Sequence, residues 1–181
     1  MPLFDTGNSH LDFASIFGLI AVAFGVLLLS KFLRDLICAL RGYRVNELIT
    51  AKDNIAAATE QAGYLVGVLM GFLGSIVVPA DAEGFVAMAE AVALAGALSI
   101  ILQNVADLLS DKLIFRGIDD RSAIFDDANL AVAVGKAGVS IATGFVIRGA
   151  LADGSATLLA CTVWFFIAQA VMVLAALLYQ V

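Results

Sequence analysis

The chain contains three long stretches without a single charged side chain. Eighteen uncharged residues separate Asp12 from Lys31, twenty separate Glu60 from Asp81, and no charged residue follows Asp153. At 1.5 Å per helical residue, stretches of this length can cross about 30 Å of hydrocarbon. Charged residues make up 14% of the chain, against about 25% in an ordinary soluble domain. The sequence therefore predicts an all-α integral membrane protein and excludes a soluble one.

Five membrane-spanning helices are expected, joined by two long and two short connections. Pro79 ends the second helix, because proline lacks the amide hydrogen that a helix needs. Each span is an apolar run between charged or turn-forming residues. The expected spans are residues 13–33, 55–78, 85–106, 130–147 and 156–178.

The basic residues predict how the helices cross the membrane. Most of the 10 Lys and Arg residues lie in or beside the two long connections, residues 34–54 and 107–129. Basic loops are retained on the cytoplasmic side, so both connections are expected there, with the N-terminus outside. No basic residue precedes the first apolar run, so a cleaved signal peptide is not expected.

A fixed shift along the sequence relates the two halves of the chain. It carries Arg41-Gly42 onto Arg116-Gly117 (116 − 41 = 75), and nine identities fall where residues 41–74 align without gaps on residues 116–149. Such a period is typical of tandem units, and with two crossings per unit both copies enter the membrane from the same side, as a parallel repeat. The fifth span either closes the bundle or begins a third, incomplete unit of a longer chain, which we favour. The predicted units are residues 1–84, 85–154 and 155–181.

The second helix of each unit opens with asparagine and carries glycine nine residues later. These motifs are Asn54-Ile55-Ala56-Ala57 with Gly63 and Gly67, and Asn129-Leu130-Ala131-Val132 with Gly138. They resemble the YjfL-like bacterial inner-membrane family (domain of unknown function 350), over four spans and the start of a third unit. The resemblance implies a multi-pass protein of the bacterial plasma (inner) membrane without an established activity. Lys136 stands where the first copy has Gln61, so a role of one copy need not hold for the other.

One face of the second span combines an acid with small residues. Glu60, Gly63, Gly67 and Gly71 follow one another at helical spacing, which places them on one side of the helix. Glycines so spaced allow close helix packing, and we include Gly74 in this set. Glu60 is therefore expected to face protein and not lipid.

A second set of polar residues lies on the fourth span. Lys136, Ser140 and Thr143 form a stripe that begins with Asn129. Asn129 and Asn54 either cap the first turns of their helices or line the inner mouth of a pathway, where helix N-termini favour anions.

Two ion pairs are expected inside the membrane. An unpaired charge there costs about 2.5–3.5 kcal/mol, so we expect Glu60 to meet Lys136 directly or through water. Glu90 is expected to meet Arg148 nearer the outer surface. These pairs either fix helix register or flank a polar cavity for an ion or small solute. Two further residues are expected beside the first pair, Gln61 and Asn104.

The charged connections are expected to be mostly solvated loops. The alternative is a docking surface, since residues 34–44 can form an amphipathic helix lying along the lipid headgroups.

Several function classes are excluded by composition. The chain has one histidine and two widely separated cysteines, so no metal site, cofactor or enzyme activity is expected. No basic aromatic patch favours nucleic acid. Two interpretations remain: an oligomeric channel or transporter-like module for an ion or small solute, or a membrane anchor that docks a soluble cytoplasmic partner. The expected partners are the lipid bilayer, further copies of the chain and, in the second interpretation, that soluble protein.

Overall fold

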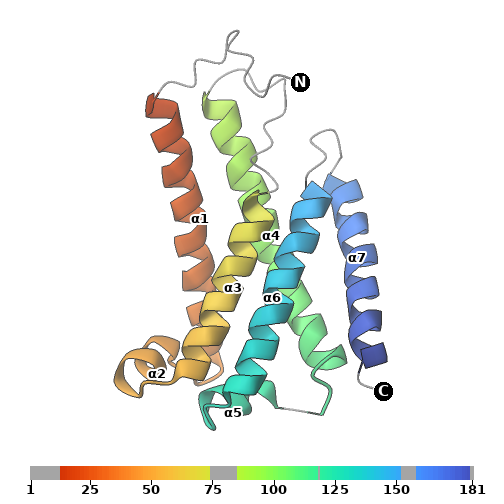
Figure 1. The fold of residues 1–181 in the computed structure, drawn as a ribbon. Helices are drawn as coiled ribbons and strands as arrows, with labels where there is room; N and C mark the ends of the chain where they lie inside the picture. Colours follow the sequence, from red (N-terminus) through yellow and green to blue (C-terminus); the bar gives the residue numbers. More distant parts are fainter. Residues whose placement is uncertain (1–12, 74–84, 118, 152–157, 180–181) are drawn as a thin grey trace.

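The computed structural model describes residues 13–73, 85–117, 119–151 and 158–179. Within these ranges the regular secondary structure is helical and no strand occurs. Figure 1 shows the long helices side by side, with two short helices at one end of the bundle. In chain order the helices are α1 (Phe13–Leu40), α2 (Val45–Ala51), α3 (Ile55–Leu73), α4 (Phe85–Leu113), α5 (Asp120–Phe125), α6 (Leu130–Leu151) and α7 (Leu158–Tyr179).

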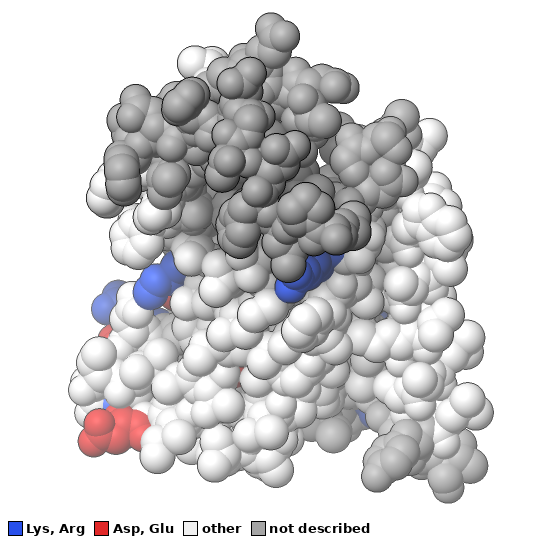
Figure 2. Space-filling view, turned by 45° about the horizontal axis from the view of Figure 1, so that its top comes forward, with Lys and Arg blue, Asp and Glu red and all other residues white. Residues whose placement is uncertain are grey.

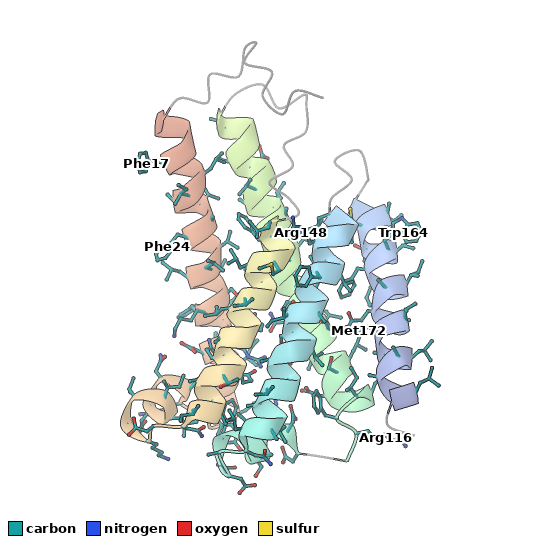
Figure 3. All side chains as sticks on the ribbon, viewed as in Figure 1. Phe17, Phe24, Arg116, Arg148, Trp164 and Met172 are labelled. Carbon is teal, nitrogen blue, oxygen red and sulfur yellow. The ribbon has the colours of Figure 1, made fainter. Side chains whose placement is uncertain are left out.

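The outer surface of the bundle is suited to lipid. Five helices, α1, α3, α4, α6 and α7, are long and apolar enough to cross a membrane. In Figure 2 the described flank of the bundle carries few charged side chains. Phe17 and Phe24 on α1, and Trp164 on α7, point away from the bundle (Figure 3) and are 69%, 61% and 62% exposed. Because so large an apolar surface is unfavourable in water, the predicted five-span membrane fold is confirmed.

Two of the membrane helices extend further than the sequence predicted. Helix α1 continues to Leu40 and α4 to Leu113, whereas the expected spans ended at residues 33 and 106. The alternative of a surface helix over residues 34–44 is contradicted, because α1 continues to Leu40 and Arg34 within it is only 5% exposed. The prediction ended these spans just before Arg34 and Asp107. The predicted stop at Pro79 falls outside the described residues.

The connections that lead into α3 and α6 have matching geometry. The amide of Asn54 donates to the carbonyl of Leu48, and at the aligned position of the second unit the amide of Asn129 donates to that of Ala123. Gly42 and Gly117, which the same shift aligns, have φ angles of 90° and 89°, which glycine adopts without the clash that a Cβ would cause. The tandem repeat stays a prediction, and these matches support it.

Helices α3 and α6 pack with their backbones in contact. A Cβ atom added at Gly63 would overlap Ala137, and one added at Gly67 would overlap the carbonyl oxygen of Ser140. In return, a Cβ atom at Gly144 would overlap the carbonyl of Gly67. The lack of a side chain at these three glycines permits this approach. The seam between α3 and α6 is therefore closed along these positions.

Other predicted glycines differ in how closely they are packed. A Cβ atom at Gly71 would lie 3.0 Å from Cγ2 of Ile147, so this position is also tight. At Gly138 a Cβ atom would meet nothing within 4 Å among the described residues. Gly74 lies outside the described residues.

We expect Gly67→Ala to destabilise the bundle by about 1–3 kcal/mol, the usual cost of inserting a methyl group into a filled interior. The new Cβ must push α6 away, because it meets backbone and not a flexible side chain. Gly138→Ala is the matched control, with the same chemical change in open space. The midpoint of thermal unfolding, measured on purified protein in detergent, compares the stability of the two variants. Equal midpoints for the two variants would contradict the packing.

Candidate functional site

Five charged side chains are buried together at the end of the bundle where α2 and α5 lie (Figure 1). Each comes from a different helix: α1, α3, α4, α5 and α6. Buried charges need partners, because an isolated charge in an apolar interior is strongly unfavourable. The residues, with their exposed fractions, are Arg34 (5%), Glu60 (3%), Asp107 (8%), Asp120 (6%) and Lys136 (3%).

Arg34 joins α1 to two other helices. Its Nη1 donates to Oδ2 of Asp107 at 2.6 Å, and its Nη2 donates to Oε1 of Glu60. The guanidinium also lies over the ring of Tyr64, 4.8 Å from the ring centroid. The planar guanidinium can serve two carboxylates at once. Arg34 therefore holds α1 against α3 and α4.

Lys136 joins α6 to α4 and α5. Its Nζ lies 3.1 Å from Oδ1 of Asp107 and 2.5 Å from Oδ2 of Asp120, and it also pairs with Asp111. Asp107 thus contacts Lys136 through one oxygen and Arg34 through the other. Arg121 on α5 extends the chain of contacts, 3.4 Å from Oδ2 of Asp111. One continuous set of ion pairs links five helices.

We call these residues the ionic network and define it by its seven charged groups. Three are cations and four are carboxylates, so the sum is 3 − 4 = −1 when all are ionised. Five members are buried, while the side chains of Arg121 and Asp111 are 19% and 18% exposed. The members are Arg34, Glu60, Asp107, Asp111, Asp120, Arg121 and Lys136.

A stripe of polar residues leads from the ionic network into the bundle along α4. Ser99, Gln103, Asp107 and Asp111 follow at intervals of four residues, which places them on one face of the helix. Twelve residues of helix cover about 18 Å, more than half of the hydrocarbon thickness. Nε2 of Gln103 donates to the carbonyl of Ser140 at 3.0 Å. The stripe therefore lies against the seam between α3 and α6.

Several polar atoms along this interior have no hydrogen-bond partner among the described residues. Unpartnered buried polar atoms are uncommon in folded proteins and need an explanation. A polar interior that binds water or a passing ion would supply the missing partners. The atoms are Oγ of Ser99, Oε1 of Gln103, Oγ1 of Thr143, Oε2 of Glu60 and both side-chain amide atoms of Gln61.

A small internal cavity lies within the ionic network. Arg34, Glu60, Asp120 and Lys136 line it from four helices, and Ile124 is among its apolar walls. Its volume is about 10 Å³. That is close to the minimum needed for one water molecule. Single water molecules fit this space, whereas an organic solute does not.

The predicted direct ion pair between Glu60 and Lys136 is wrong. Glu60 pairs with Arg34, and Lys136 pairs with three aspartates on α4 and α5. Both side chains line the same cavity, so the prediction placed them at the right depth but chose the wrong partners. The true partners were overlooked because α4 was expected to end before Asp107 and Asp111. Asn104, expected nearby, donates instead to the hydroxyl of Tyr64 at 2.9 Å.

The predicted pair of Glu90 and Arg148 is not formed. Both side chains are exposed, and no ion pair joins them in the described part of the chain. Figure 3 shows Arg148 toward the end of α6 that lies away from α5. The long stem of an arginine lets its charge reach the interface without a partner.

The two repeated asparagines both cap their helices, in different surroundings. Oδ1 of Asn54 accepts the amide of Ala57 at 2.9 Å, and Oδ1 of Asn129 accepts that of Val132 at 3.3 Å. Asn54 is buried and its Nδ2 also donates to the carbonyl of Ile124 at 3.0 Å, whereas Asn129 is exposed. Asn54 therefore fastens α3 to α5, a role that Asn129 does not share.

A contact outside the spans joins the two long connections. The hydroxyl of Tyr43 donates to Oδ2 of Asp126 at 3.0 Å, and the Tyr43 ring packs on Phe125 with centroids 4.9 Å apart. The hydrogen bond stabilises the neutral phenol, which raises the pKa of Tyr43 above its ordinary value. This contact holds α5 near the base of α2.

Comparison with known proteins yields a family but no described activity. A family model described as Domain of Unknown Function (DUF350) matches residues 8–151 and, in a second alignment, residues 117–181. No curated protein and no solved structure matches the chain.

We expect Lys136→Met to destabilise the protein by about 3–5 kcal/mol, the usual cost of removing one partner from a buried ion pair. The change leaves Asp120 without its cation and Asp107 and Asp111 with one partner each. Lys112→Met on α4 is the control, because the Lys112 side chain is exposed. Unfolding in detergent, followed by circular dichroism, measures both variants. A Lys136→Met protein as stable as the control would contradict the ionic network.

Proposed function

Because this chain belongs to the DUF350 family, whose description assigns no activity, we propose its function from the site: a transporter-like membrane module that passes an ion or small solute. The observation that carries the proposal is the buried polar stripe of α4, which runs from Ser99 to the ionic network. Charged groups within membrane spans are costly and typically mark ion or proton pathways. A protein that only anchored a partner would need no such interior.

The proposed orientation places the ionic network on the cytoplasmic side of an inner membrane. Basic residues gather in the connections at the α2 and α5 end, and such segments are retained inside. Ions would then enter the stripe from the cytoplasm through the network. The unpartnered amide of Gln61 and the hydroxyl of Thr143 would supply polar contacts deeper in the bundle.

We further propose that transport requires more than one copy, or an opening of the single chain. The α3–α6 seam is closed by backbone contact, and the cavity in the network is only about 10 Å³. The described residues of one chain therefore form no continuous path in this conformation. Further copies meeting through the exposed apolar faces would complete it.

The second candidate function is a membrane anchor for a soluble cytoplasmic protein. A polar pocket of about 280 Å³ lies beside α2, lined by residues that include Tyr43, Arg44, Glu47, Lys52 and Asp126. It lies outside the spans, where a soluble protein can reach it. This candidate explains the charged connections, but it leaves the buried stripe without a role.

Flux into vesicles distinguishes the two candidates. We expect proteoliposomes containing the full chain to pass protons, sodium or potassium faster than protein-free vesicles, as followed with ion-sensitive dyes. Glu60→Gln is expected to lower this flux about tenfold or more, since one charge-assisted contact contributes about 1.5–3 kcal/mol and 1.4 kcal/mol corresponds to tenfold. Lys112→Met, which alters an exposed charge on α4, should leave the flux unchanged.

Absence of flux in folded, correctly inserted protein would contradict the transport proposal. The anchor function is favoured if a soluble protein then binds the chain and this binding is lost when Arg41 and Arg44 are replaced.

A further inference from the structure

The ionic network contains one more acid than base. Arg34, Lys136 and Arg121 are its cations, against four carboxylates. The five buried members alone, without the more exposed Arg121 and Asp111, also sum to 2 − 3 = −1. A single uncompensated charge within a span costs about 2.5–3.5 kcal/mol. One further positive charge would remove this cost.

The space in the network favours a proton over a metal ion as that charge. Sodium, potassium and calcium need several oxygen ligands around a cavity of their own size, as calcium does with six to eight. Here the cavity has a volume of about 10 Å³, and Arg34, Arg121 and Lys136 all line it. Of the described residues that line it, only Glu60 and Asp120 supply carboxylates, which are too few oxygen ligands for such an ion. A proton needs only one carboxylate oxygen and an acceptor for its hydrogen bond.

Glu60 presents such an oxygen to the cavity. Its Oε1 accepts from Arg34, while its Oε2 is buried and has no partner in the described part of the chain. The residue is 3% exposed and lines the cavity. A proton taken from water at the inner surface would form an O–H bond here, and one water molecule in the cavity could accept its hydrogen bond.

We infer that the ionic network binds one proton per chain, held on a carboxyl of the Glu60 and Asp120 side of the cavity. The role of this proton rests on the proposed function: it is the ion that the module passes or uses to drive a solute. Its presence does not, because it is inferred from the charge sum of the network and from the unpartnered Oε2 of Glu60. The metal-ligating alternative would leave all four carboxylates ionised.

The proton is shared with the charged and titratable groups that surround it. Helix α1 contributes Arg34 and Cys38, and the neighbouring Asp35 is paired with Lys31 at 2.5 Å. Any change of ionisation at one member alters the electrostatic field at the others. From the other helices the groups are Glu60 and Tyr64 of α3, Asp107 and Asp111 of α4, Asp120 and Arg121 of α5, and Lys136 of α6.

Infrared spectroscopy of the full chain in detergent at neutral pH tests the inference directly. The carbonyl-stretch band of a protonated carboxyl, identified by its shift in heavy water, should correspond to one group per chain. Asp120→Asn makes the network neutral, 3 − 3 = 0, so the band should disappear. Lys136 keeps two aspartates in this variant, which preserves the fold. Glu60→Gln also removes one carboxylate and makes the network neutral, so it is the second variant if Asp120→Asn does not fold.

Two further variants make the test depend on charge and not on one position. Arg121→Gln changes the balance to 2 − 4 = −2, so the band should grow to about two groups. Asp127→Asn, an exposed acid outside the network, should leave the band unchanged. Loss of the band in Asp120→Asn, its growth in Arg121→Gln and no change in Asp127→Asn would support the bound proton.

A band absent from the unaltered chain, or present only when sodium and potassium are withheld, would overturn the inference in favour of a metal cation. A band that survives both Asp120→Asn and Glu60→Gln would overturn it as well. The result is independent of transport. Vesicles without flux but with the band would contradict the proposed function alone, and flux without the band would contradict this inference alone.

Discussion

The ion pairs of Asp107 are the interaction on which the rest of the structure depends. One carboxylate oxygen meets Arg34 of α1 and the other meets Lys136 of α6, while Asp107 itself belongs to α4. Between helices in lipid there is no hydrophobic force that would hold them together, so packing and polar contacts must do so. A carboxylate shared by two cations fixes three helices at one depth. The contacts of Glu60 and Asp120 extend this arrangement to α3 and α5.

The glycine seam and the ionic network support each other. Direct contact of α3 with α6 at Gly67 brings Ser140 within reach of Gln103, which continues the α4 stripe above Asp107. A wider seam would separate these groups and let lipid or water between the helices. The polar interior is thus held in place by small residues at its centre and by charge at the end of the bundle where α5 lies. The proposed transporter-like function rests on this combination.

Hydropathy was sufficient to predict the fold but not the site. Long apolar runs identify spans because lipid solvates apolar side chains and not charge, and each of the five predicted spans corresponds to an apolar helix. The prediction stopped two spans just before Arg34 and Asp107, because the charged residues that follow were assigned to the cytoplasmic connections. Both residues lie inside helices and are buried against partners from other helices.

Pairing was predicted from depth alone, which explains the error at Glu60. Depth follows from position in the sequence, whereas the direction in which a side chain faces depends on how the helices are rotated. One available signal was the four-residue spacing from Ser99 to Asp111, which marks a polar face of α4. No comparable sequence pattern points to the partner of Glu60, because Arg34 lies on another helix, α1. Only the assembled bundle shows that the two meet.

A double-mutant cycle between Arg34 and Glu60 tests the central claim most directly. Unfolding free energies of Arg34→Gln, Glu60→Gln and the double variant give the energy with which the two side chains are coupled. Groups in direct buried contact should show a coupling of about 1–3 kcal/mol, whereas independent sites add within about 0.3–0.5 kcal/mol. A coupling in the first range is what the ionic network predicts. Additive effects would contradict it, because they would show that α1 and α3 are not joined by this contact.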